Sequence, residues 1–105
     1  MPDIQIFDAF AFFSQKIQET EQNLIGKQAE AEILDANRRN LELALSSLSA
    51  LSDEQQRALA VEHASLSEVR TSTLRALESL QSEIEVLTAK LTALKAARDA
   101  ARVEQ

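Results

Sequence analysis

The chain has no cysteine, tryptophan or tyrosine, and its 105 residues include one glycine, one proline and one histidine. Without cysteine it can form neither disulfides nor thiolate metal sites, which fits a reducing compartment. With so little glycine and proline there are few places where the backbone is expected to turn. Because the remaining residues are rich in the helix formers Ala, Leu, Glu and Gln, the sequence predicts an all-α fold in a single domain spanning 1–105.

An excess of basic residues is also missing, since 17 acidic residues face 11 lysines and arginines and the net charge is −6. Neither half of the chain carries a basic stripe, which disfavours nucleic acid as a partner. The longest unbroken apolar run is Ala9 to Phe13, far short of the ~20 residues that span a bilayer. We therefore expect no transmembrane segment, and no signal peptide because a basic region followed by an apolar run is lacking. The expected location is the cytoplasm or a virion or secretion assembly.

Residue patterns that carry chemistry are equally scarce. His63 has Leu59, Ala60, Leu66 and Ser67 one helical turn away, which is no convincing metal-ligand set. The serines include no glycine-rich nucleophile elbow, and the acidic residues are spread over helix faces. The sequence therefore predicts no enzyme, no metal and no cofactor.

What the chain does contain is a heptad pattern. Leucine or isoleucine recurs at 3-4 spacing, which keeps one side of a helix facing a partner helix. In the second half these positions are Leu77, Leu80, Ile84, Leu87, Leu91 and Leu94. In the first half they are Phe10, Phe13, Ile17, Thr20, Leu24, Lys27, Ala31, Leu34, Arg38, Leu41, Leu45 and Leu48. Upstream of Leu77 the second stripe reads Leu59, His63, Leu66, Val69 and Thr73, with a stutter after Val69.

A turn between the two stripes is predicted near residues 50–52. Ser52 and Gln55 form a capping box, and Asp53 and Glu54 suit the first turn of a new helix. The expected elements are an aromatic N-terminal segment at 1–13, a helix at about 14–50 and a second helix at about 53–102. They form a long antiparallel two-helix hairpin, a coiled coil completed by oligomerisation into a bundle. The alternative is a continuous parallel coiled-coil fibre with a polar interval at 52–62.

Folding about Ser52 predicts a register in which Phe10 lies opposite Leu94 and Lys27 opposite Leu77. Polar residues inside the first stripe have two interpretations. Arg38 can extend to Glu62 or Glu68 on the other helix, and Lys27 to Glu78. Alternatively, Arg38 and Lys27 specify the register at a cost in stability.

Two further groups of apolar residues point to partners. A second strip on each helix would stay exposed in a lone hairpin, and small side chains allow another helix to approach closely. On the second helix the expected self-association residues are Val86, Ala89, Ala93, Ala96 and Ala100; on the first helix the strip is Ile25, Ala29, Ile33, Ala36 and Leu43.

The N-terminal segment holds every aromatic residue of the chain. These residues cover too much of a helix circumference to face a single partner helix. The expected partner-binding residues are Ile4, Ile6, Phe7, Phe10 and Phe12. A membrane-surface role is disfavoured because Asp3 and Asp8 lie among them.

In length and hairpin layout the chain resembles the small helical-hairpin proteins of specialised secretion systems, and its acidic, helical character is equally compatible with phage and virion assembly proteins. Ser49-Ala50-Leu51-Ser52 stands where one of the secretion families has a Trp-x-Gly turn. We expect a non-enzymatic structural or interaction protein that binds copies of itself and at least one other protein. An assembly chaperone or adaptor that covers a partner's apolar helix is the alternative.

Overall fold

The computed structural model describes residues 6–103, and these form three helices and no strand. The helices are α1 (Ala9–Ser49), α2 (Asp53–Ala58) and α3 (Ala60–Val103). Helix α1 packs against α3, so the predicted all-α helical hairpin is confirmed. The continuous-helix alternative is wrong, because the long first helix ends at Ser49 and the chain turns back.

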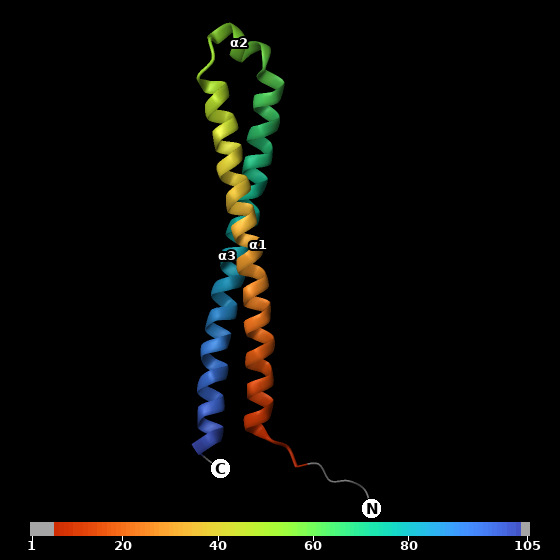
Figure 1. Ribbon diagram of the computed structural model, residues 1–105, viewed down its shortest axis with the longest axis vertical. Coiled ribbons are helices and arrows are strands. Elements are labelled where there is room, and N and C mark those ends of the chain that lie inside the picture. The colour runs from red at the N-terminus through yellow and green to blue at the C-terminus, as the bar shows by residue number, and fades with distance from the viewer. Residues whose placement is uncertain (1–5, 104–105) are drawn as a thin grey trace, which may run out of the picture. The chain divides into compact units, whose positions relative to one another are not determined.

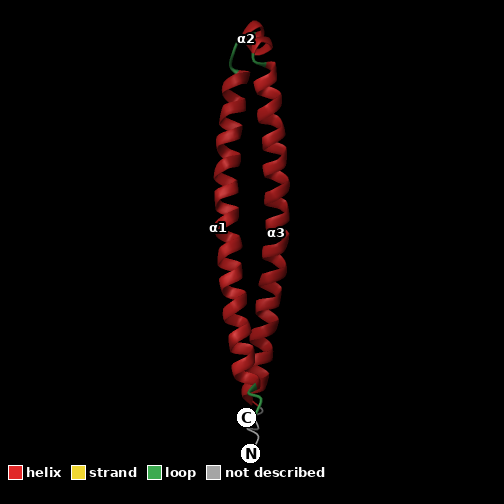
Figure 2. Ribbon diagram, turned by 90° about the vertical axis from the view of Figure 1, so that its right-hand side faces the viewer, coloured by secondary structure: helices red, strands yellow, loops and turns green. Residues whose placement is uncertain are grey.

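The hairpin divides into two units, each containing a part of α1 and a part of α3. Residues 28–82 form one unit, in which α2 connects the end of α1 to the start of α3 (Figure 1). Residues 1–27 and 83–105 form the other, and in its described part the first turns of α1 lie beside the last turns of α3 (Figure 2).

Helix α1 begins at a capping residue and continues through the single glycine. The Asp8 carboxylate accepts a hydrogen bond of 3.0 Å from the backbone N–H of Ala11, which satisfies one of the free donors of the first turn. Gly26 lies inside the helix, where it costs about 1 kcal/mol relative to alanine. The helix continues because the heptad stripe has the same phase on both sides of Gly26, as the sequence predicted.

The turn after α1 forms without glycine because a side chain satisfies the free carbonyl groups. Gln56 Nε2 donates to the backbone oxygens of Ser49 and Leu51, at 3.1 and 2.9 Å. The predicted capping box is confirmed: Ser52 Oγ accepts from the Gln55 N–H, and Gln55 Oε1 accepts from the Ser52 N–H. The glutamine therefore replaces the left-handed glycine that commonly ends a helix.

The predicted second helix is interrupted near its beginning. Leu59 ends α2 with φ −109° and ψ 22°, and α3 starts at the next residue. Asp53–Ala58 is thus a separate short helix of about one and a half turns. It lies between the ends of the long helices in Figure 1. The sequence did not reveal this break, because neither glycine nor proline stands near Leu59.

The heptad stripes form the seam between α1 and α3. All twelve stripe positions of α1 are buried or partly buried, which confirms the pattern on that helix. The most deeply buried apolar residues are Ile17, Leu45, Leu77 and Leu80. Thr20 is also buried, and its hydroxyl donates to the Lys16 carbonyl at 2.7 Å. Only one face of α1 packs against α3, so the apolar core of the hairpin is a single narrow row of side chains.

Two seam positions on α3 differ from the prediction: His63 is exposed, and Arg70 takes the position expected for Val69. Val69 is 48% exposed, whereas Arg70 is partly buried. With Arg70 in place of Val69 the stripe runs from Leu66 through Arg70 and Thr73 to Leu77 in an unbroken 4-3-4 rhythm. The predicted stutter was therefore wrong: it arose because an apolar residue was preferred to the arginine beside it.

The register also differs, by about one heptad. Lys27, expected opposite Leu77, forms an ion pair of 3.1 Å with Glu83. The Arg102 guanidinium lies 5.0 Å from the centre of the Phe10 ring, where Leu94 was expected. A shift of one heptad returns the same apolar positions to the seam, so the stripes alone could not distinguish the two registers. The extra chain is taken up by α2, which makes the connection longer than the predicted turn.

Candidate interaction surfaces

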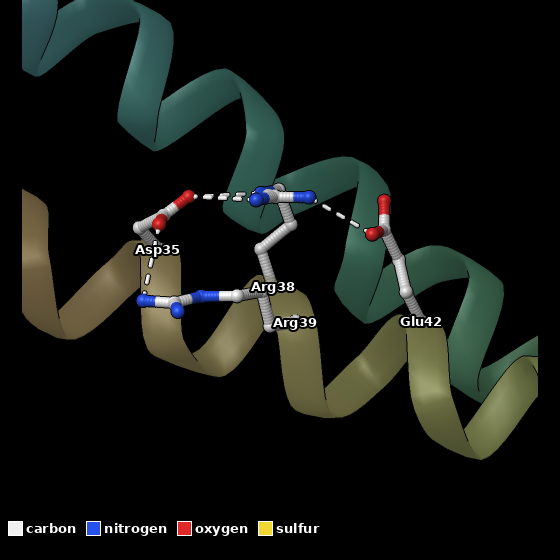
Figure 3. Close-up of polar contacts among 4 residues, drawn as sticks. All are labelled: Asp35, Arg38, Arg39 and Glu42. Carbon is white, nitrogen blue, oxygen red and sulfur yellow. Dashed lines mark hydrogen bonds and ion pairs between the residues drawn. The ribbon is translucent and has the colours of Figure 1, made fainter.

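The Arg38 guanidinium forms ion pairs with carboxylates of its own helix. Its guanidinium lies 2.9 Å from Asp35 and 2.8 Å from Glu42, and Arg39 also contacts Asp35 at 3.3 Å (Figure 3). The hydrogen bond to Asp35, together with the charges of Asp35 and Glu42, raises the pKa of the Arg38 guanidinium. The ion pairs therefore follow helical spacing along α1, rather than crossing to Glu62 or Glu68 as the sequence suggested.

Lys27 differs from Arg38 because its ion pair joins the two helices. Its ammonium group contacts Glu83 across the seam, where the sequence suggested Glu78. Both side chains are partly exposed, so the pair contributes at most about 1 kcal/mol. Because the pair joins specific positions of α1 and α3, Lys27 remains a candidate register residue. The contacts of Arg38 stay within α1 and do not support a role for Arg38 in the register.

The aromatic N-terminal segment presents apolar side chains to solvent. Ile6 is 91% exposed, Phe7 is 72% exposed and Phe12 is 40% exposed. Ile4 lies outside the described residues. Phe10, which the sequence placed both in the seam and among the docking residues, is partly buried beneath Arg102. The structure thus brings three of the five predicted docking residues to the surface and places Phe10 in the seam.

The exposed aromatic rings contact one another. Phe12 lies between Phe7 and Phe13, with ring centres 5.5 and 5.4 Å apart, and Lys16 is 5.7 Å from the Phe12 ring. Such ring pairs add about 0.5–1.5 kcal/mol beyond area burial. The contacts hold Phe7 and Phe12 together as one aromatic ridge on the outside of the helix start.

Both long helices carry an exposed apolar strip on the side away from the seam. The outer strip of α1 contains three large aliphatic residues, each more than 60% exposed, and two exposed alanines: Ile25, Ala29, Ile33, Ala36 and Leu43. The outer strip of α3 contains one large residue and four exposed alanines: Val86, Ala89, Ala93, Ala96 and Ala100. The heptad places these residues roughly opposite the seam, so the partner helix cannot cover them.

The sequence-based reasoning missed two arginines of α3. Arg70 was passed over for Val69, although strict 3-4 counting back from Leu77 would have found it. Its Nε is buried and has no hydrogen-bond partner. Arg102 lies in the last turn of α3, and its contact with Phe10 could not be found without the correct register.

His63 is exposed at the turn end of the unit formed by residues 28–82. It lines a cavity of about 450 Å³ together with Leu48, Leu59 and Asp53. Within residues 6–103 no cluster of His, Asp or Glu could hold a metal ion. None of the described helices is both long and apolar enough to cross a membrane. Ser49, Gln56, Arg57 and Ala60 complete the lining of this cavity.

Comparison with known protein families, curated proteins and solved structures finds no match for this chain.

Proposed function

We propose that this chain is a non-enzymatic coiled-coil interaction protein, a small structural subunit of a larger virion- or secretion-type assembly. Its outer strips pack against other copies, and its aromatic ridge docks on a different protein. One observation carries the proposal: within residues 6–103, four apolar residues are buried and ten large apolar residues are exposed. Burying one such side chain is worth about 1.5–3 kcal/mol, so their exposure favours association.

The exposed residues are grouped rather than scattered. Seven of the ten belong to the aromatic ridge with Ile6 or to the two outer strips. Scattered apolar residues are ordinary on a protein surface, but contiguous rows at helical spacing are typical of helix docking. The alternative role, a chaperone or adaptor covering a partner's apolar helix, is favoured by the three large aliphatics of α1, which are each mostly exposed.

Substituting Ala93 by glutamate is expected to reduce the mass of the protein in solution to that of the 11.6 kDa monomer. The new carboxylate would be buried against another helix in the assembly, where an unpaired charge is costly. Light scattering coupled to size exclusion measures the mass. The matched control is Ala64→Glu, which makes the same change at an exposed position of α3 outside the strip and should leave the mass unchanged. If Ala93→Glu keeps the wild-type mass, the α3 strip does not mediate self-association.

Substituting Ile6 and Phe12 together by serine is expected to abolish docking to the natural partner while costing about 1–3 kcal/mol of stability. Ile6 is 91% exposed, so the loss comes mainly from the two ring contacts of Phe12, with Phe7 and Phe13. Phe13→Ala is the comparison, since Phe13 lies in the seam and its removal should destabilise the fold by more. Pull-downs from the source organism and melting curves separate the two effects. If the double variant melts as early as Phe13→Ala, the ridge is core and the docking hypothesis fails.

A further inference from the structure

We infer that the outer strip of α1 in one copy binds the outer strip of α3 in a second copy, so that each contact joins two different surfaces. The inference rests on the proposed self-association and specifies its geometry. The two strips differ in both charge and side-chain size, and in each respect one complements the other.

Charge separates the helices that carry the strips. Over the span of the α1 strip, residues 25–43 contain four acids and three bases: Glu30, Glu32, Asp35 and Glu42 against Lys27, Arg38 and Arg39. Over the span of the α3 strip, residues 86–100 contain one acid and three bases: Asp99 against Lys90, Lys95 and Arg98. The α1 span therefore has an excess of one negative charge and the α3 span an excess of two positive charges, so packing α3 on α3 would bring bases together. Packing α1 on α3 places opposite charges at the rim of the contact.

Side-chain size gives the same pairing. The α1 strip projects Ile25, Ile33 and Leu43, each mostly exposed, whereas the α3 strip is lined by alanines with Val86 at one end. Large side chains packed against a row of small ones let two helices approach closely and fill the space between them. Two alanine rows facing each other would bury little area, and two rows of large aliphatics would keep the helices apart.

A contact between unlike surfaces has a consequence for assembly. When two copies join in this way, one copy still has a free α1 strip and the other a free α3 strip. Further copies can therefore add until a ring closes or a filament extends. In a symmetric dimer, by contrast, both copies use the same surface, so no surface is left free for a third copy.

Two variants, each blocked on one strip, test the pairing. Ile33→Glu blocks the α1 strip, and Ala93→Glu blocks the α3 strip. We expect each variant to be monomeric alone and an equimolar mixture to sediment at twice the monomer mass of 11.6 kDa. The mixture should stop at two copies, because each variant retains one functional strip. Circular dichroism checks that both remain helical, and Leu43→Glu with Val86→Glu is the second pair if either variant does not fold.

The other outcomes contradict the pairing. If Ile33→Glu alone keeps the wild-type mass, α3 strips bind one another; if Ala93→Glu alone keeps it, α1 strips do. If the mixture stays monomeric while the wild type associates, the two strips do not bind each other, although self-association still stands. A wild type that is itself monomeric would instead refute the proposed self-association.

Discussion

Replacing Leu80 by alanine is expected to lower the free energy of unfolding by about 2–3 kcal/mol. Leu80 is 6% exposed and packs in the seam, so the substitution removes buried methyl groups and leaves a cavity. The loss should fall in the lower part of the usual range, because among the described residues no large side chain is fully enclosed. Urea denaturation followed by circular dichroism measures it.

The matched control is Leu43→Ala, which makes the same change in the outer strip of α1. Leu43 is 68% exposed, so in dilute solution, where copies separate, the free energy of unfolding should change by no more than about 0.5 kcal/mol. Equal losses for Leu80→Ala and Leu43→Ala would show that the seam is not the main core of the hairpin.

Replacing Arg70 by leucine should have the opposite sign and stabilise the hairpin by about 1–2 kcal/mol. The arginine places a buried Nε without a hydrogen-bond partner at a seam position. Leucine removes that unsatisfied donor and supplies the apolar side chain that the heptad favours there. For a domain of this size the melting temperature should rise by roughly 4–8 °C per kcal/mol.

Arg75→Leu controls for the loss of a positive charge, because Arg75 lies on the same helix and is exposed. It should leave the melting temperature nearly unchanged. A lower melting temperature for Arg70→Leu would mean that the Arg70 charge stabilises the seam. It would contradict the expectation that the buried Nε destabilises the hairpin.

Much of the fold could be predicted because it follows from local rules. The stripe from Phe10 to Leu48 requires a partner helix whatever the rest of the chain does, and the Ser52–Gln55 capping box starts a helix from its own atoms. The outer strips followed from the same periodicity, since residues opposite a two-helix seam have nothing to cover them. These features depend on residues close in sequence, and the structure shows them where they were expected.

The register and the middle of the seam could not be predicted in the same way. A heptad pattern matches itself after a shift of seven residues, so the choice between Leu77 and Glu83 as the neighbour of Lys27 depends on the length of the connection. That length depends on the break at Leu59 and on the contacts of Gln56 with the end of α1. Arg70 was missed for a related reason. Its position belongs to the seam, but its side chain is charged, and helix seams usually exclude charged side chains.

Sedimentation equilibrium of the wild-type chain, from low micromolar to millimolar concentration, tests the central claim most directly. If the outer strips are association surfaces, the average mass should rise steadily with concentration above that of the 11.6 kDa monomer, and it should return to the monomer value on dilution. Apolar surface exposed in rows should not stay in water at high concentration. A mass of 11.6 kDa at every concentration would contradict the account.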